Sequence, residues 1–236
     1  MRTWIVAGVA AVSVVAAIVL AGGLDRPVAV EAQGGGTIEA EVKYNGKPVV
    51  ETLKINKDPE VCGKETKIEK VAVGANKGLA NAVVSVAGAK GATTARKGVI
   101  DQKGCTFVPH VVAMTPGEIE IKNSDGILHN VHTYSTANAS INKAMPKFRK
   151  TMTEKLEKPE VVKVTCDVHS WMLGWVAVMP HPFFGVTDAS GATKIENVPA
   201  GKHTIEVWHE TLGKQTADVE VKAGQTTKVS LEMKGK

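Results

Sequence analysis

The stretch TCDVHSWM, residues 165–172, places Cys166, His169 and Met172 at intervals of three residues. A β-branched run precedes it and a Leu-Gly pair follows it, which favours flanking strands and disfavours a helix. Along one continuous strand the three side chains would spread over about 20 Å and could not share an ion. A tight loop between two strands lets all three turn toward a common point, so we predict a loop that holds a metal.

The chemistry of these donors selects the metal. Thiolate, thioether and imidazole together suit copper better than calcium or magnesium. A second imidazole is available in HNVH, residues 129–132, which follows a turn at residues 124–126. His129 is the better candidate and His132 the alternative. Two histidines, one thiolate and a weak axial methionine form a type 1, or blue, copper site, which serves electron transfer.

The pair of motifs, HNVH and then CDVHSWM 37 residues after His129, resembles the cupredoxins, and most closely their amicyanin members. This resemblance implies that His129, Cys166, His169 and Met172 bind copper. It implies that Asn130 hydrogen-bonds across to the loop that holds the cysteine. It also implies that the ring edge of His169 lies near the surface and acts as the electron port. The simpler alternatives are a buried thiol beside an incidental histidine and methionine, or a cupredoxin fold that has lost its copper.

The rest of the chain predicts an all-β protein. We expect a cupredoxin-like Greek-key β-sandwich at residues 100–180 and a second, immunoglobulin-like or transthyretin-like sandwich at residues 181–236, where short alternating strands are punctuated by glycine-containing turns. Residues 33–99 form a β region with a polar, irregular insertion. Its opening strand, GTIEAEVKYNGKP (36–48), resembles transthyretin-like or carboxypeptidase-regulatory-like domains, as does the C-terminal tract. Whether the two tracts share a sheet stays open.

Residues 1–32 contain a membrane anchor or a signal segment. Arg2 is followed by an apolar run from Trp4 to Leu20, long enough for one transmembrane helix. We expect an uncleaved anchor in the inner membrane, with the remainder exported to the periplasm; a signal peptide cleaved before Gln33 is the alternative.

Three cysteines in an exported chain predict one disulfide and one remaining thiol. Cys62 and Cys105 lack a nearby His-Met pattern, so we expect them to pair. This leaves Cys166 for the metal. Closing a loop of this length is worth about 4 kcal/mol on the chain-entropy model.

Four further histidines, His110, His132, His181 and His209, offer an alternative in which they converge on a second metal site and support an enzyme. Structural, hydrogen-bonding roles are the simpler interpretation. Catalytic sequence motifs are absent, so we expect a protein that is not an enzyme.

The net charge of +5 is accompanied by no nucleic-acid motif, which excludes DNA or RNA as a partner. A lysine-rich stretch at residues 143–158 could meet an acidic redox partner or simply be a solvated face. The expected partner is a redox protein or a respiratory or photosynthetic membrane complex. An accessory subunit of such a complex, with copper absent, is the alternative function. Trp171, beside His169, is either an exposed docking contact or a lid over the metal.

Overall fold

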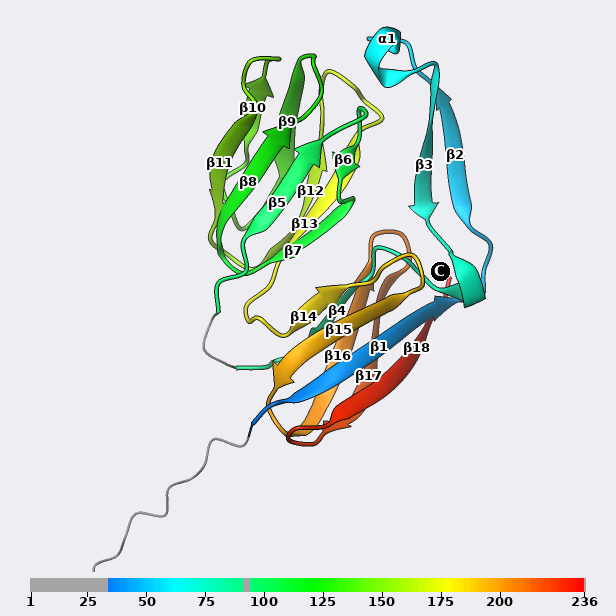
Figure 1. Cartoon of the computed structure of the whole chain (residues 1–236), viewed down its shortest axis with the longest axis vertical. Helices are drawn as coiled ribbons and strands as arrows, with labels where there is room; N and C mark the ends of the chain where they lie inside the picture. Colours follow the sequence, from blue (N-terminus) through cyan, green and yellow to red (C-terminus); the bar gives the residue numbers. More distant parts are fainter. Residues whose placement is uncertain (1–33, 91–93, 236) are drawn as a thin grey trace, which may run out of the picture. The chain divides into compact units, whose positions relative to one another are not determined.

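A computed structural model describes residues 34–90 and 94–235 of the chain (Figure 1). In these ranges the helical elements are one α-helical turn, α1 (Pro59–Cys62), and one 3-10 turn, η1 (Ala75–Lys77); all other regular elements are strands. The predicted all-β class is confirmed. None of the helices in the described ranges is long and apolar enough to cross a membrane. The predicted anchor or signal segment, residues 1–32, lies outside the described residues.

The first sandwich is built from residues 98–178 and contains a five-stranded and a four-stranded sheet. The five-stranded sheet has the order β10-β9-β12-β13-β7 and consists of β7 (Val111–Met114), β9 (His129–Tyr134), β10 (Asn142–Met145), β12 (Glu160–Thr165) and β13 (Leu173–Val178). The four-stranded sheet has the order β11-β8-β5-β6 and consists of β5 (Gly98–Gln102), β6 (Phe107–Val108), β8 (Gly117–Asn123) and β11 (Thr151–Leu156).

The register of this sandwich positions the predicted metal ligands. Strands β12 and β9 are antiparallel, and Thr165 pairs with His132. Strand β12 also pairs with β13, where Thr165 meets Leu173. Cys166 therefore leaves the sheet beside the first half of β9. The chain between β12 and β13 is a tight loop, as the spacing of the three donors predicts.

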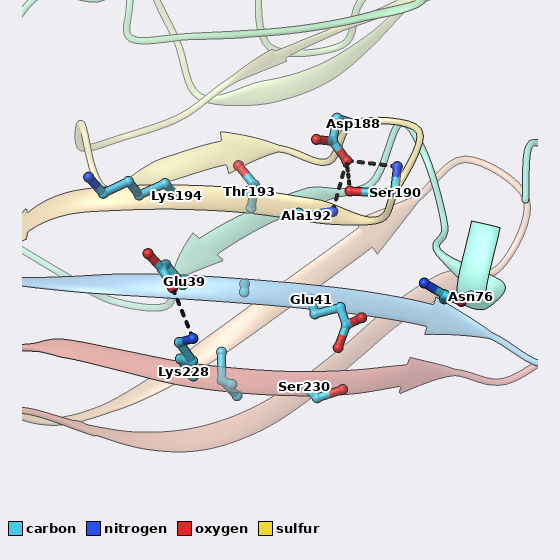
Figure 2. A pocket seen from close by; sticks show the side chains of 12 residues that line it. Glu39, Glu41, Asn76, Asp188, Ser190, Ala192, Thr193, Lys194, Lys228 and Ser230 are labelled. Atoms are coloured by element: carbon cyan, nitrogen blue, oxygen red, sulfur yellow. Dashed lines mark hydrogen bonds and ion pairs between the residues drawn. The ribbon is translucent and has the colours of Figure 1, made fainter. Parts of the chain in front are cut away.

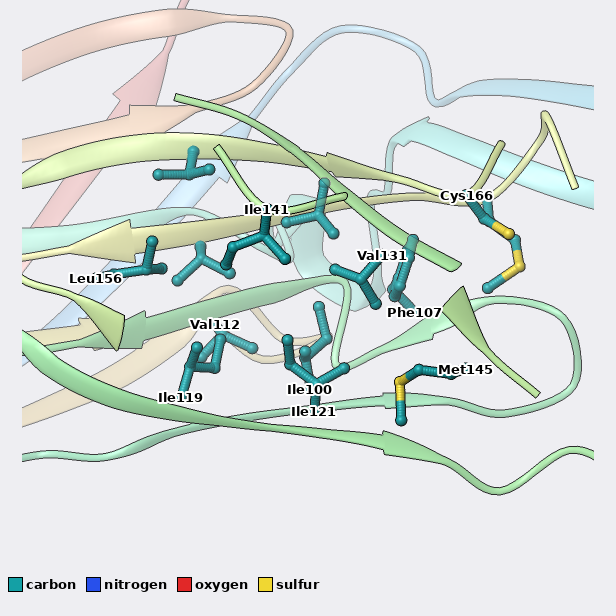
Figure 3. Close-up of a cluster of buried hydrophobic side chains, with 14 of the residues drawn as sticks. Ile100, Phe107, Val112, Ile119, Ile121, Val131, Ile141, Met145, Leu156 and Cys166 are labelled. Carbon is teal, nitrogen blue, oxygen red and sulfur yellow. The ribbon is translucent and has the colours of Figure 1, made fainter. Parts of the chain in front are cut away.

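Apolar side chains on the inner faces of both sheets form the core of the first sandwich (Figure 3). Along β8, alternate residues such as Ile119 and Ile121 point inward, which is the period expected of a strand with one buried face. Burying an aliphatic side chain of this kind contributes roughly 1.5–3 kcal/mol. Cys166 belongs to the same buried cluster, so the packing of both sheets holds the loop end on which it sits.

The second sandwich contains a three-stranded sheet, β15-β1-β18, and a four-stranded sheet, β14-β4-β16-β17. Its strands are β1 (Gly36–Tyr44), β4 (Val83–Val86), β14 (Phe184–Val186), β15 (Ala192–Val198), β16 (Gly201–His209), β17 (Gly213–Val221) and β18 (Thr226–Met233). A separate buried cluster, which includes Ile38, Val84 and Ile205, fills this sandwich.

Strands from residues 33–99 and from residues 181–236 share both sheets of the second sandwich. Strand β1 runs parallel to β18, with Ala40 beside Val229, and antiparallel to β15. Strand β4 lies between β14 and β16. The question left open by the sequence is thereby answered, because burying the inner faces of β1 and β4 requires the C-terminal strands.

Two strands, β2 (Val49–Lys54) and β3 (Glu65–Val71), form a hairpin with α1 near its tip (Figure 1). We call residues 49–71 the arm. The sequence-based expectation of an irregular insertion was wrong here, because the arm is an ordered antiparallel pair whose side chains are mostly exposed. The predicted disulfide, Cys62–Cys105, is present and joins the arm to the first sandwich.

Candidate metal centre

Three of the four predicted ligands meet at one end of the first sandwich. His129 opens β9, while Cys166 and His169 lie in the loop between β12 and β13. All three side chains are buried. Their potential ligand atoms lie within 4.8 Å of one another, which makes them a compact donor group.

The distances within this group have the dimensions of a metal site. The Cys166 Sγ atom lies 3.9 Å from Nδ1 of His129 and 3.8 Å from Nδ1 of His169. The two Nδ1 atoms are 2.9 Å apart. Ions of the zinc and copper size bind nitrogen at about 2.0–2.1 Å and sulfur at about 2.3 Å, so an angle of about 120° places the two atoms about 3.8 Å apart. An ion at the centre of the group would thus reach all three donors.

The outer nitrogen of each imidazole bonds to a carboxylate. Nε2 of His129 lies 2.9 Å from Oδ2 of Asp125, and Nε2 of His169 lies 2.9 Å from Oδ2 of Asp58. A carboxylate accepts a hydrogen bond, so in each ring the proton belongs on Nε2. The lone pair of Nδ1 is then free and faces the centre, which is the arrangement that orients metal-binding histidines.

The electrostatics around His129 favour a neutral, metal-binding ring. Burial lowers the pKa of His129, against the opposing effect of Asp125. Burial by itself would raise the pKa of Asp125, but hydrogen bonds from the backbone N–H groups of Cys105 and Gly104 and from His129 outweigh it, and the pKa lies below its usual value. The carboxylate is therefore charged at neutral pH and keeps the imidazole oriented.

Asn130 makes the contacts that the sequence resemblance implied. Its backbone N–H lies 3.5 Å from Sγ of Cys166, and its side-chain carbonyl accepts from the N–H of Asp167 at 2.5 Å. Its amide also donates to the Asp167 carboxylate at 3.0 Å. Asn130 therefore ties β9 to the loop and gives the sulfur of Cys166 a hydrogen-bond donor.

His132, the alternative ligand, faces away from the donor group. It lies three positions after His129 on β9, and residues an odd number apart point to opposite faces of a strand. Its Nδ1 instead hydrogen-bonds to the Asp167 carboxylate at 2.9 Å. This hydrogen bond is the main reason that the pKa of Asp167 lies below its usual value.

Met172, the fourth predicted ligand, is buried in the cluster that contains Cys166. Its backbone N–H donates to the carbonyl of His169 at 2.9 Å, which closes the loop as a turn. Met172 thus lies in the same loop as Cys166 and His169.

The predicted surface position of the His169 ring edge was wrong. His169 has an exposed fraction of 0%. The sequence could not show this, because the covering residue, Asp58, is 111 positions away in the arm. Trp171 is also buried, and its Nε1–H donates to the carbonyl of Cys105 at 3.1 Å. Its placement is that of a lid, with its ring centroid 5.1 Å from that of His169.

The structure does not bring His110, His132, His181 and His209 together. Within residues 34–90 and 94–235, none of them belongs to a group of three or more potential ligands. His110 bonds to Glu210, and His132 bonds to Asp167. His181 and His209 are buried, and the Nδ1 of each accepts backbone N–H groups from its own turn. Each histidine already has a hydrogen-bonding role, so the second metal site is not supported.

The second sandwich carries a hollow of about 730 Å³ over β15, β1 and β18 (Figure 2). Glu39 and Lys228 form an ion pair across it at 3.8 Å, while Asp188 accepts hydrogen bonds from Ser190 and from the N–H of Ala192. The residues that line the hollow include no histidine, cysteine or aromatic side chain. Its lining therefore has no imidazole or sulfur ligand of the kind found in the group at Cys166.

The fold and the gathered donors together define a β-sandwich with a buried Cys-His-His group, joined to a second sandwich. Comparison with solved structures finds amicyanin from Paracoccus versutus at 18% identity, covering 41% of this chain and 97% of amicyanin with a TM-score of 0.32. A purple cupredoxin from Nitrosopumilus maritimus is 19% identical, covering 35% of this chain and 99% of that protein with a TM-score of 0.30.

A copper-containing nitrite reductase from Thermus scotoductus is 18% identical, with a TM-score of 0.33. The match covers 40% of this chain but only 25% of the reductase, so this chain spans about a quarter of that enzyme. A family model described as polysaccharide lyase family 4, domain II, matches residues 181–229, within the second sandwich. No curated protein sequence matches the chain.

Proposed function

We propose that this protein is an electron-transfer protein that binds one type 1 copper ion at His129, Cys166, His169 and Met172. The observation that carries the proposal is the buried donor group, in which one sulfur lies 3.8 and 3.9 Å from two imidazole nitrogens. Soft and borderline donors in this combination select copper. When bound, copper supplies a one-electron couple.

The residues of this chain prepare the site for such a couple. The buried rings are each oriented by a carboxylate, and Asn130 donates to the sulfur from β9. Because β9, β12 and β13 are adjacent in one sheet, the ligands are held from a rigid scaffold. A rigid site limits the movement that must accompany a change of charge, which favours transfer of an electron over binding of a substrate.

Copper titration of the purified protein tests this proposal. We expect one copper per chain, an intense visible absorption band from thiolate-to-copper charge transfer, and loss of that band in Cys166→Ser. His129→Ala should weaken binding. A colourless wild-type protein that takes up no copper would overturn the proposal.

We also propose that the protein is exported and acts in the periplasm, tethered by the apolar segment at residues 4–20. The Cys62–Cys105 disulfide supports an oxidising compartment, since disulfides are rare in the cytosol. Fractionation of cells that express the full chain tests both points. The protein should sediment with inner membranes and resist extraction by salt; recovery in the cytosolic fraction would contradict the proposal.

We propose a redox protein as the partner and a carrier role without catalysis. A hollow beside the donor group is lined by Asp58, Leu128 and Phe148 together with Lys57 and Lys147. Leu128 and Phe148 are 45% and 79% exposed, and the lysines give this surface a positive rim. Apolar side chains ringed by positive charge suit an acidic partner surface.

The second sandwich favours one other function, an accessory subunit of a membrane complex. Its strands come from both sides of the metal-binding sandwich in the sequence, so it is an integral part of the protein. Mild solubilisation of membranes separates the two functions. Stoichiometric co-purification with a larger complex supports the subunit, and recovery of the protein alone supports the carrier.

A further inference from the structure

The tip of the arm covers one side of the candidate metal centre. Asp58 reaches Nε2 of His169 at 2.9 Å, although the two residues are 111 positions apart. Asp58 keeps an exposed fraction of 31%, whereas His169 has none. The carboxylate therefore stands between the ring and the solvent.

The local structure of the arm commits Asp58 to this contact. Asp58 occupies the N-cap position of α1, where an aspartate usually accepts a hydrogen bond from the helix backbone. Its side chain makes no such bond and points to His169 instead. Its backbone is left-handed, with φ of 49°, a conformation that Asp and Asn tolerate better than other side chains. The Asp58 carboxylate thus binds a distant ring and does not cap its own helical turn.

The disulfide links the turn that carries Asp58 to the turn that hydrogen-bonds Asp125, and these two carboxylates are the ones bonded to the two imidazoles. Cys62 ends α1, the turn that begins after Asp58, and its N–H donates to the Asp58 carbonyl at 2.9 Å. Its partner, Cys105, donates its own N–H to Asp125 at 2.9 Å, and Asp125 holds the ring of His129. One covalent bridge therefore connects the two turns whose carboxylates orient the two rings.

Packing of the arm supports the same position. Leu53, Ile55 and Ile68, from β2, the tip and β3, contact the hydrophobic cluster of the first sandwich. The arm is therefore held by apolar contacts along its length as well as by the bridge.

We propose that Asp58 is a positioning residue for the metal centre, and that the disulfide-pinned arm closes the His169 side of that centre to water and small ligands. This inference rests on the proposed copper function. A carboxylate that accepts from Nε2 makes Nδ1 a stronger donor, which stabilises the more highly charged copper ion. The covered ring edge also implies that electrons do not enter directly through His169.

Asp58→Asn tests the positioning role, because asparagine keeps the size and the left-handed backbone but removes the charge. Loss of such an outer partner typically weakens metal binding about 10–100-fold. We expect a weakening of this size for Cu(II) in a chelator competition, with Cu(I) affinity unchanged. Each tenfold weakening then raises the reduction potential by about 59 mV. Glu60→Gln, in the same turn and exposed, is the matched control and should change neither value.

Azide tests the closure. The visible spectrum of the copper-loaded wild type should not change on adding azide, whereas Asp58→Ala and the double variant Cys62→Ser/Cys105→Ser should show a new azide-dependent band. Unchanged Cu(II) affinity and potential in Asp58→Asn, or a wild type that binds azide as readily as Asp58→Ala, would overturn the inference.

A metal-free measurement distinguishes failure of this inference from failure of the copper function. In the ¹⁵N spectrum of the metal-free wild type, the His169 ring should carry its proton on Nε2, with slow exchange. Asp58→Ala should remove that protection, while Glu60→Gln should keep it. An identical His169 signal in wild type and Asp58→Ala would overturn the positioning role, whether or not copper binds.

Discussion

Removing the Cys62–Cys105 bridge should lower the free energy of unfolding by about 4 kcal/mol. The two cysteines are 43 positions apart. In the chain-entropy model, closing a loop of this size lowers the conformational entropy of the unfolded chain by about 13 cal/mol/K. This loss corresponds to about 4 kcal/mol of stability at 25 °C. The perturbation is the double variant Cys62→Ser/Cys105→Ser, which leaves Cys166 in place.

Urea unfolding measures this loss. With a denaturant dependence of about 1–3 kcal/mol per molar urea, 4 kcal/mol corresponds to a midpoint lower by roughly 1–4 M. Trp171 is a suitable fluorescent reporter, because its Nε1–H bonds to the carbonyl of Cys105. Amide exchange should locate the loosening in the arm and in the turn at Cys105.

Two results would refute this reasoning. A double variant with an unchanged midpoint would show that the bridge does not constrain the unfolded chain. A wild type whose midpoint is insensitive to reductant would show that the bridge is not formed. The reduced wild type is the matched control, and it should unfold at the same urea concentration as the double variant.

Three other predictions concern the surroundings of the donor group. Asp125→Ala leaves two backbone N–H groups and one ring N–H without an acceptor and should cost about 1–3 kcal/mol or more in urea unfolding. Because the pKa of Asp125 is lower in the folded than in the unfolded protein, its carboxylate stabilises the fold at pH values above its unfolded pKa, and this stabilisation is lost as the pH falls through the folded pKa. An alanine variant whose stability falls as steeply with acid as that of the wild type would contradict this. His132→Ala should keep one copper per chain, since that ring bonds to Asp167, and loss of copper in a dialysis assay would contradict the assignment. In stopped-flow experiments on the reduced, copper-loaded protein, Lys147→Glu should slow oxidation of the protein by hexacyanoferrate(III), an anion, and speed its oxidation by a cationic cobalt complex. Equal rates in variant and wild type would contradict a basic docking surface.

The donor group was largely predictable from the sequence, because its signal is local. Three potential ligands lie within seven residues of the chain, and the motif beginning at His129 supplies the fourth. The choice between His129 and His132 follows from strand periodicity once β9 is assigned. The disulfide followed from counting cysteines.

The covering of His169 was not predictable, because it depends on a contact across 111 positions. The segment that makes this contact has mostly exposed, charged strands, and its few alternating apolar residues, such as Leu53 and Ile68, do not show which distant surface they pack against. Asp58 itself looks like an ordinary helix cap. Only the folded chain shows that its carboxylate is used elsewhere.

The architecture of the second sandwich was predictable only in part. Alternating strands and glycine-containing turns indicated a sandwich near the C-terminus. The sequence left open whether β1 belongs to it, because strand pairing between distant segments has no local signature. Strands β10 and β11 are also hard to predict from the sequence, because exposed lysines such as Lys143 and Lys155 weaken their strand pattern.

The most direct test of the account is the copper content and visible spectrum of the wild-type protein beside Cys166→Ser. The account predicts one copper per wild-type chain, bound with an intense blue band that Cys166→Ser lacks. A wild type that stays colourless in excess copper, or a Cys166→Ser variant with the same band, would contradict it.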